Sequence, residues 1–345
     1  MDIVSPDQYQ AFASGRFPEP EEFAQGVWFL PVALPAQMPG GAQSFSYAYL
    51  IDDFSGAVHV IDPGWPLPEN LQRWEELLGK LGKSFDDVAT VTATHFHPDH
   101  LGLAPELCSR SGAPLIMHEH EAHVLGEAQS VLQDRGEHAA HMVLRPYALF
   151  TEERLKELQV PEQRWSELTK VGALPVIPQP TMQVKGGDSL PVNGRDIKVV
   201  WTPGHTGGHM CLVEEEAGVF FSADHVLPHI NSGVGLGGVS PSNPMVDYLT
   251  ALNEVARYDS YIVAPGHEYL FRGLSSRAEQ LRNHHLGRSQ EVLEAMSAVT
   301  SVWDIASKVT WSDGFENLRS YKLGSALSQV SIHMDLVVNH REWLA

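Results

Sequence analysis

The sequence of 345 residues contains only two cysteines, Cys108 and Cys211. Two cysteines exclude a disulfide framework, and their separation excludes the Cys-x-x-Cys arrangement of many zinc sites. Basic residues are also scarce, because 23 Lys and Arg stand against 43 Asp and Glu and leave a formal net charge of -20. Nucleic-acid binding depends largely on Lys and Arg that neutralise phosphates, so this charge argues against a nucleic-acid partner.

Long apolar runs are absent as well. No apolar stretch approaches the roughly 20 residues of a membrane-spanning helix, so we expect no membrane partner. The first residues, MDIVSPDQYQ, contain no basic start and no apolar run, so we expect no signal peptide and a cytoplasmic protein. Apolar residues nevertheless make up 43% of the chain, which is enough to bury a substantial core.

Short apolar and β-branched runs alternate with helical patterns along most of the chain. The runs are typical of strands buried on both faces, and they cover residues 57–62, 88–94, 114–118, 196–201, 209–214, 219–224 and 261–266. Between them, apolar spacing predicts a helix over 68–82 and another that begins at Asn243 and Pro244, a suitable N-cap and first helical residue. This alternation predicts a layered α/β fold.

Two regions depart from this alternation. Residues 119–185 are largely helical and polar, and a segment of this length is typical of a lid or of a substrate-pocket wall. Residues 286–345 contain further helical stretches without a ligand-like motif. We therefore expect a catalytic domain over residues 1–285, with a helical insertion at about 119–185, and a small helical appendage over 286–345. The appendage is expected to pack either on its own domain or on a second subunit of a homodimer.

The most specific motif is ATHFHPDHLG at residues 93–102, directly after a predicted buried strand. It places His95, His97, Asp99 and His100 within six residues. Imidazole nitrogens and carboxylate oxygens bind zinc and similar metals. In an extended segment, His95 and His97 point to the same side, whereas Asp99 and His100 follow a turn and can face a second point. This one stretch can therefore serve two metal ions.

Three more residues of the same types stand at the carboxyl ends of other predicted strands. His205 lies in WTPGHTGGH, Asp224 ends FFSAD, and His267 lies in APGHEYL. The carboxyl ends of strands are where α/β folds place their chemistry. The agreement of residue type and position predicts one site that brings these residues and the HFHPDH motif together.

The order of these motifs resembles that of the metallo-β-lactamase superfamily. The resemblance comprises His-x-His-x-Asp-His, the His of Thr-Pro-Gly-His-Thr, the Asp of Ser-x-Asp-His and the His of Pro-Gly-His, and it covers about residues 25–270. It implies an α/β fold built as a four-layer αββα sandwich with the site at one edge. Asp62 in VIDPGWP is similar to an early structural motif of the family.

The resemblance also implies how the ligands are shared between two divalent metal ions. One ion would take His95, His97 and His205, the other would take Asp99, His100 and His267, and Asp224 would bridge them. Zinc is the expected metal, and Mn²⁺ and Fe²⁺ are alternatives that the same ligand types accept.

Departures within the superfamily narrow the expected branch. True lactamases usually lack a bridging aspartate at the position of Asp224, and diiron flavoproteins usually carry Glu where His97 stands. The complete ligand set is similar to the glyoxalase II, lactonase and nuclease branches, and to hydrolases related to the lactamase-β-like 2 proteins.

A pair of metal ions roughly 3.5–4 Å apart can share a water and lower its pKa towards neutrality, and the bridging hydroxide then attacks a carbonyl. We therefore expect a binuclear hydrolase that acts on a small-molecule ester, thioester or lactone. Asp99 is expected to orient the hydroxide as well as to bind metal. His225 and Tyr269, which closely follow metal ligands, are candidates for contacting the substrate or protonating a leaving group.

Three alternatives stay open on the sequence alone. A nuclease or phosphodiesterase would use the same metals but needs clustered Lys and Arg, which are sparse here. An enzyme similar to the persulfide dioxygenases would use a single iron ion. A catalytically silent binding protein would be expected to have lost metal ligands, and this chain keeps the whole set.

Several polar residues outside the ligand set are interpreted as non-ligands. His118 opens the HEHEAH segment at the start of the insertion, where polar residues are ordinary, so we expect it to bind no metal. His284 and His285 are expected to be solvated helix residues. Thr206 and His209 are expected to support the ligands through hydrogen bonds, which metal-binding histidines usually need.

Overall fold

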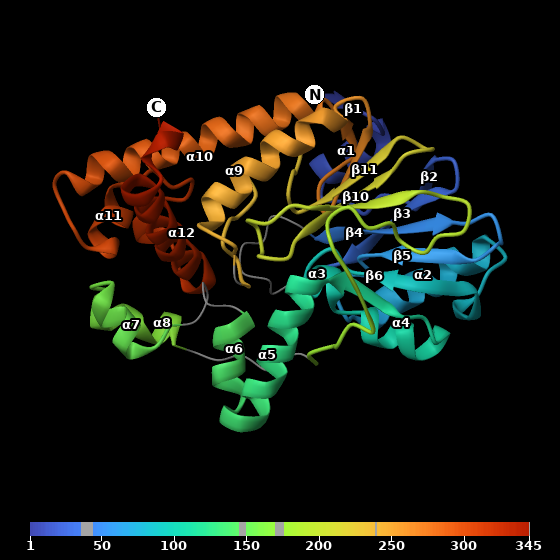
Figure 1. Cartoon of the computed structure of the whole chain (residues 1–345), viewed down its shortest axis with the longest axis horizontal. Helices are drawn as coiled ribbons and strands as arrows, with labels where there is room; N and C mark the ends of the chain where they lie inside the picture. The colour runs from blue at the N-terminus through green and yellow to red at the C-terminus, as the bar shows by residue number, and fades with distance from the viewer. Residues whose placement is uncertain (36–43, 145–149, 170–175, 239, 345) are drawn as a thin grey trace.

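A computed structural model describes residues 1–35, 44–144, 150–169, 176–238 and 240–344. Two sheets stack face to face, and helices cover the outer face of each (Figure 1). In the described residues, one sheet has seven strands in the order β2-β3-β4-β5-β6-β7-β8, and the other has six in the order β1-β13-β12-β11-β10-β9. The predicted four-layer αββα sandwich is confirmed.

The seven-stranded sheet changes from antiparallel to parallel at its centre. Strands β2 to β5 pair antiparallel, whereas β5 to β8 pair parallel. Parallel neighbours need a crossover, which α2 (Pro68–Lys80) supplies before β6, and α3 (Pro98–Leu101) with α4 (Ala104–Ser111) before β7. The strands are β2 (Glu21–Ala24), β3 (Val27–Ala33), β4 (Phe45–Asp52), β5 (Val58–Ile61), β6 (Val88–Thr92), β7 (Leu115–His118) and β8 (Met182–Val184).

The six-stranded sheet brings the carboxyl ends of three strands to one edge. Strand β10 pairs antiparallel with β9 and β11, and β12 pairs parallel with β11, so β9, β11 and β12 run in the same direction. Helix α9 (Pro244–Val255) forms the crossover between β11 and β12, and Asn243 caps it as predicted. The strands are β1 (Asp2–Ile3), β9 (Ile197–Trp201), β10 (Met210–Glu214), β11 (Val219–Ala223), β12 (Ile262–Pro265) and β13 (Phe271–Arg272).

Three apolar layers hold the sandwich together. The central layer packs Tyr47 and Phe29 of one sheet against Phe221 of the other. The outer layers pack Trp74 of α2 on the seven-stranded sheet, and Leu249 of α9 on the six-stranded sheet. Each fully buried side chain of this kind contributes about 1.5–3 kcal/mol relative to exposure. The site loops therefore project from a tightly packed apolar scaffold.

The insertion and the C-terminal helices lie against each other. The insertion contains α5 (Glu119–Arg135), α6 (Glu137–Leu144), α7 (Glu152–Glu157) and α8 (Trp165–Leu168), and the C-terminal part contains α10 (Leu274–Met296), α11 (Val302–Lys308) and α12 (Ser320–Asn339). Leu155 and Leu168 pack with Val292 and Leu327 in one apolar cluster, and α7 and α8 lie below α11 and α12 in Figure 1. Helix α10 runs unbroken through residue 285. The expected boundary between a catalytic domain and a C-terminal appendage at residues 285 and 286 stays a prediction.

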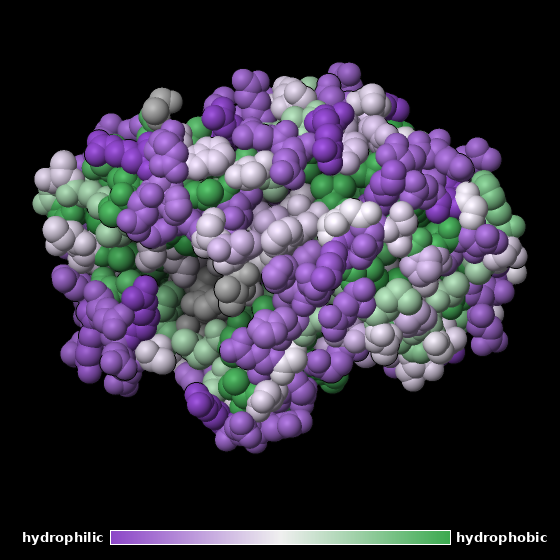
Figure 2. Space-filling model, in the orientation of Figure 1, coloured by the Kyte–Doolittle hydropathy of each residue, from purple (hydrophilic) through white to green (hydrophobic). Residues whose placement is uncertain are grey.

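The face of the molecule in Figure 2 mixes hydrophilic and apolar residues. Among the described residues, no helix combines the length and the apolar character needed to cross a membrane. The expected homodimer and the cytoplasmic location stay predictions.

Candidate metal centre

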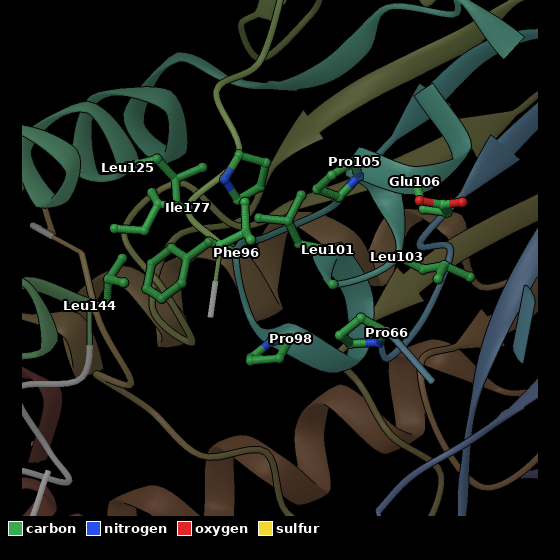
Figure 3. Close-up of a pocket in the computed structure, with 13 residues that line it drawn as sticks. Pro66, Phe96, Pro98, Leu101, Leu103, Pro105, Glu106, Leu125, Leu144 and Ile177 are labelled. Carbon is green, nitrogen blue, oxygen red and sulfur yellow. The ribbon is translucent and has the colours of Figure 1, made fainter. Parts of the chain in front are cut away.

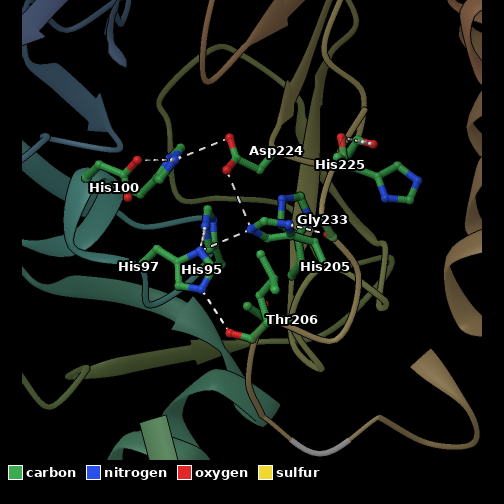
Figure 4. A network of polar contacts seen from close by, with 12 residues as sticks. His95, His97, His100, His205, Thr206, Asp224, His225 and Gly233 are labelled. Carbon is green, nitrogen blue, oxygen red and sulfur yellow. Dashed lines mark hydrogen bonds and ion pairs between the residues drawn. The ribbon is translucent and has the colours of Figure 1, made fainter. Parts of the chain in front are cut away.

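The predicted ligands lie in four segments that each follow the carboxyl end of a strand. Strand β6 leads into His95 and the short helix α3, β9 leads into His205, β11 into Asp224 and β12 into His267. Because these strand ends meet at one edge of the sandwich, their side chains converge from both sheets (Figure 4). The structure therefore brings all the predicted ligands together, in two groups.

The first group contains His95, His97, His205 and Asp224, and all four residues are buried. Nε2 of His95 lies 3.0 Å from Nδ1 of His97, and Nε2 of His205 lies 3.1 Å from the same atom. Nε2 of His205 is 3.5 Å from Oδ2 of Asp224. Around a tetrahedral zinc ion with bonds of about 2.0–2.1 Å, neighbouring ligand atoms lie roughly 3.3–3.4 Å apart. The spacing of the first group fits such an ion.

The second group contains Asp99, His100 and His267. Nε2 of His267 lies 3.3 Å from Oδ2 of Asp99, and Nε2 of His100 lies 3.8 Å from it. Oδ1 of Asp224 is 3.4 Å from Nε2 of both histidines. Asp224 therefore presents one carboxylate oxygen to each group, which is the position expected of a ligand shared by two metal ions.

Unsatisfied polar atoms support the fit to metal ions. Among the described residues, Nε2 of His100 and Oδ1 of Asp224 are buried and have no hydrogen-bond partner. A buried polar atom without a partner costs about 1–3 kcal/mol, so such atoms need another ligand. Gly266 also leaves space here, because a Cβ at this position would lie 2.6 Å from Oδ1 of Asp224. The type of these atoms, their spacing and their lack of hydrogen-bond partners all suit metal coordination.

The two groups differ in protonation. Burial alone would lower the pKa of His267, but the neighbouring carboxylates of Asp224 and Asp99 have a larger effect and raise that pKa to about 10. In the first group, burial together with the neighbouring His205 lowers the pKa of His97 to about 3. Neutral imidazole is the form that binds metal. The first group would therefore offer neutral imidazoles to a metal ion at neutral pH, whereas a metal ion at the second group would have to displace protons.

Hydrogen bonds on the outer side of the rings orient the ligands. Asp62 takes a left-handed backbone (φ 51°), and its Oδ2 accepts a 2.8 Å hydrogen bond from Nδ1 of His100. Its Oδ1 accepts a 2.7 Å bond from the backbone N–H of Thr94, which tethers the HFHPDH loop. Nδ1 of His205 donates to the carbonyl of Gly233 at 2.8 Å. These contacts leave Nε2 of both histidines facing the centre.

The two residues predicted to support the ligands act less directly. The hydroxyl of Thr206 donates to Glu121 at 2.7 Å, and Nδ1 of His209 lies 2.8 Å from the hydroxyl of Thr202. The His209 ring packs 5.1 Å from the His95 ring. Among the described contacts, Thr206 and His209 therefore support the ligands through a second carboxylate and through ring packing, and neither makes a hydrogen bond to a ligand.

Glu121 is a residue that sequence reasoning overlooked. It lies in the first turn of α5, is fully buried, and accepts hydrogen bonds from Thr206, Gly208 and Phe96. Burial raises its pKa to about 7 although these hydrogen bonds lower it. The available signal was an acidic residue in HEHEAH, directly after a predicted strand. His118 of the same segment stacks on Trp201 and belongs to neither metal group, as expected.

The other predicted catalytic residues lie in different environments. The Asp99 side chain is 13% exposed and is the most open of the carboxylate ligands. His225 is fully buried, its ring packs 4.9 Å from the Tyr248 ring, and Figure 4 shows it pointing away from Asp224. Tyr269 is 8% exposed, and its ring lies 5.0 Å from that of Tyr9. The roles of His225 and Tyr269 stay predictions that this geometry does not favour.

An apolar cavity of about 310 Å³ lies beside the HFHPDH turn (Figure 3). Phe96 and Pro98, the neighbours of His97, form part of its wall, and the insertion supplies Leu125 and Leu144. Among the described residues that line it, Glu106 alone carries a charge. The volume lies at the lower end of the range for small-molecule sites.

Comparison with known proteins identifies the family. A sequence profile of the metallo-beta-lactamase superfamily matches residues 41–267. The lactamase-like protein nscB of Aspergillus fumigatus is 24% identical over 237 residues, which are 69% of this chain and 52% of that protein. The atrochrysone carboxyl ACP thioesterase of Aspergillus fumigatus is 23% identical over 245 residues, which are 70% of this chain and 56% of that protein. This chain spans less than two thirds of the length of these curated relatives.

Solved structures share the fold over nearly the whole chain. A metallo-beta-lactamase family protein from Thermus thermophilus superposes with a TM-score of 0.69 at 23% identity, covering 93% of this chain and 95% of that one. A beta-lactamase domain protein from Burkholderia ambifaria gives a TM-score of 0.69 at 26% identity, covering 92% of this chain and 88% of that one. With its αββα sandwich and its matching motifs, this chain belongs to the metallo-beta-lactamase superfamily.

Proposed function

We propose that this chain is a binuclear metal-dependent hydrolase that cleaves a small thioester, ester or lactone. The observation that carries the proposal is Asp224, whose two carboxylate oxygens face two separate groups of ligand atoms. A site for one metal ion would need no carboxylate in this shared position. The matched ligand spacing on either side of Asp224 supports two ions, and we propose zinc for both.

The chain would hold one ion with His95, His97 and His205, and the other with Asp99, His100 and His267. Bound metal ions would supply Lewis acidity to a carbonyl oxygen and lower the pKa of a coordinated water. We propose that Asp99, the most exposed carboxylate ligand, accepts a hydrogen bond from the attacking water. Most of the ligand side chains are buried, and Asp99 is the most accessible of them.

The cavity and the relatives support the proposed substrate class. The apolar cavity, which Phe96 and Pro98 of the HFHPDH turn help to line, supports a carbonyl compound with an apolar acyl group. A relative named as an ACP thioesterase supports a thioester as the first substrate class to test. The net charge of -20 argues against a nucleic-acid substrate, because a phosphate backbone needs positive charge. A small molecule is therefore the proposed partner.

A substrate screen with zinc-loaded protein tests the proposal. The screen contains p-nitrophenyl esters, acyl thioesters, lactones and bis-p-nitrophenyl phosphate, each with a chelator-treated sample as its control. We expect turnover of carbonyl substrates that is lost with the metal and restored by adding zinc. Turnover of the phosphodiester alone would contradict the proposal in favour of a phosphodiesterase. Oxygen consumption with a persulfide by an iron-loaded sample would contradict it in favour of a dioxygenase.

A further inference from the structure

We infer that Glu121 is a positioning residue for the first metal group, and that it couples the helical insertion to the metal centre. Helix α5 begins at Glu119, directly after β7, so the first turn of the insertion carries this carboxylate into the core. Glu121 is fully buried, whereas Glu119, two residues earlier, is only partly buried and pairs with Lys185. The inference rests on the proposed function only in that it assumes a metal ion at the first group.

The contacts of Glu121 join two loops that come from different sheets. Its Oε2 accepts a 3.0 Å hydrogen bond from the backbone N–H of Phe96, the residue between His95 and His97. Its Oε1 accepts bonds of 2.7 Å from the hydroxyl of Thr206 and 2.8 Å from the backbone N–H of Gly208. Thr206 directly follows His205. The Glu121 carboxylate therefore ties the loop that carries His95 and His97 to the loop that carries His205.

The chemistry of this position favours a carboxylate over its amide. Three donors converge on Glu121, and both oxygens of its side chain face them as acceptors, so one carboxyl group satisfies all three. A glutamine would turn an N–H group towards one of these donors and leave that donor buried without a partner. The fit is also close in space, because a Cβ at Gly208 would lie 2.5 Å from the backbone nitrogen of Glu121.

The second metal group is held by other residues. Asp62 orients His100 at 2.8 Å, and β12 leads directly into His267. No described contact of Glu121 reaches either residue. Loss of Glu121 should therefore loosen His95, His97 and His205 while it leaves the second group in place, and a metal titration can resolve this asymmetry.

A matched control separates positioning from general stability. Glu214 is also fully buried, and it lies at the far end of β10 from the metal centre. It pairs with Arg195 at 3.1 Å and accepts a hydrogen bond from the backbone N–H of Ala217. Glu214→Gln should destabilise the fold without touching either metal group. Thr206→Val is a milder second variant, because it removes one hydroxyl bonded to Glu121.

The experiment titrates metal-free wild type, Glu121→Gln, Thr206→Val and Glu214→Gln with Co²⁺, read by visible absorption, and with Zn²⁺ against a chromophoric chelator. Thermal unfolding is measured on the same samples. For Glu121→Gln we expect one class of site to weaken by about 10–100-fold while the other changes little. Thr206→Val should weaken the same class by less, and Glu214→Gln should leave both classes unchanged despite a lower Tm.

Two results would overturn the inference. In the first, Glu121→Gln binds both ions with wild-type affinity. In the second, Glu121→Gln and Glu214→Gln lose both classes in proportion to their loss of thermal stability. Wild-type protein that binds a single ion would contradict the binuclear proposal alone. The inference would then stand if Glu121→Gln weakened that single site, and fail if it did not.

Discussion

Replacing Asp224 by alanine perturbs both metal groups at once. Its oxygens lie 3.4 Å from Nε2 of His100 and of His267, and 3.5 Å from Nε2 of His205. Removing a residue that merely orients a metal ligand typically weakens metal binding by about 10–100-fold. Removing a shared ligand should cost more, so we expect at least one ion to bind over ~100-fold more weakly. This factor corresponds to about 2.8 kcal/mol.

The assay combines metal content after dialysis with turnover of the best carbonyl substrate. Asp224→Ala should keep at most one ion per chain and lose most of the hydrolytic activity. His118→Ala is the control, since His118 is also buried but stacks on Trp201 outside both groups. We expect it to keep both ions. Loss of a metal ion from His118→Ala together with full retention by Asp224→Ala would refute the ligand assignment.

Three further predictions concern pH, metal removal and the apolar cavity. Burial lowers the pKa of His118 to about 4 and the pKa values of His225 and His333 to about 3. As the pH falls below about 6.5, these three histidines therefore take up protons in the unfolded chain but stay neutral in the folded one. The free energy of unfolding of metal-free protein, measured in urea, should therefore fall between pH 6.5 and 4, and a flat profile would contradict this. Removal of metal by chelation should lower the Tm, and added zinc should restore it in proportion to the logarithm of its concentration, because ions that bind the folded state stabilise it. Val176 at the cavity is 79% exposed, so Val176→Trp should lower kcat/KM for octanoyl but not for acetyl esters. Val338→Trp, at another exposed valine, is the control and should change kcat/KM for neither ester. Equal effects of both variants would refute the proposal that the cavity binds the acyl group.

Seven strands and the metal ligands were predictable because each carries a local signal, whereas β3 and β4, of seven and eight residues, were not predicted. The runs at 57–62 and 219–224 appear as β5 and β11, since β-branched and apolar residues in short runs indicate strands buried on both faces. The ligands were found because parallel strands bring their carboxyl ends to one edge, whatever their order in the sequence. The short strands β1 and β13, of two residues each, carry too little pattern to be predicted.

What the sequence did not reveal depends on contacts between distant segments. The prediction that His285 is solvated is wrong, because α12 packs on α10 and leaves His285 only 2% exposed, with its ring stacked on that of His333. Glu121 was overlooked because its partner Thr206 lies 85 residues away along the chain. A local pattern shows that a helix has polar residues, but not which of them a second loop will cover.

The measurement that most directly tests a two-metal hydrolase is elemental analysis of metal per chain on protein purified without chelators. The convergence of both ligand groups on Asp224 predicts close to two zinc ions per chain. One iron ion per chain, or no tightly bound metal at all, would contradict the binuclear centre and the hydrolytic chemistry built on it.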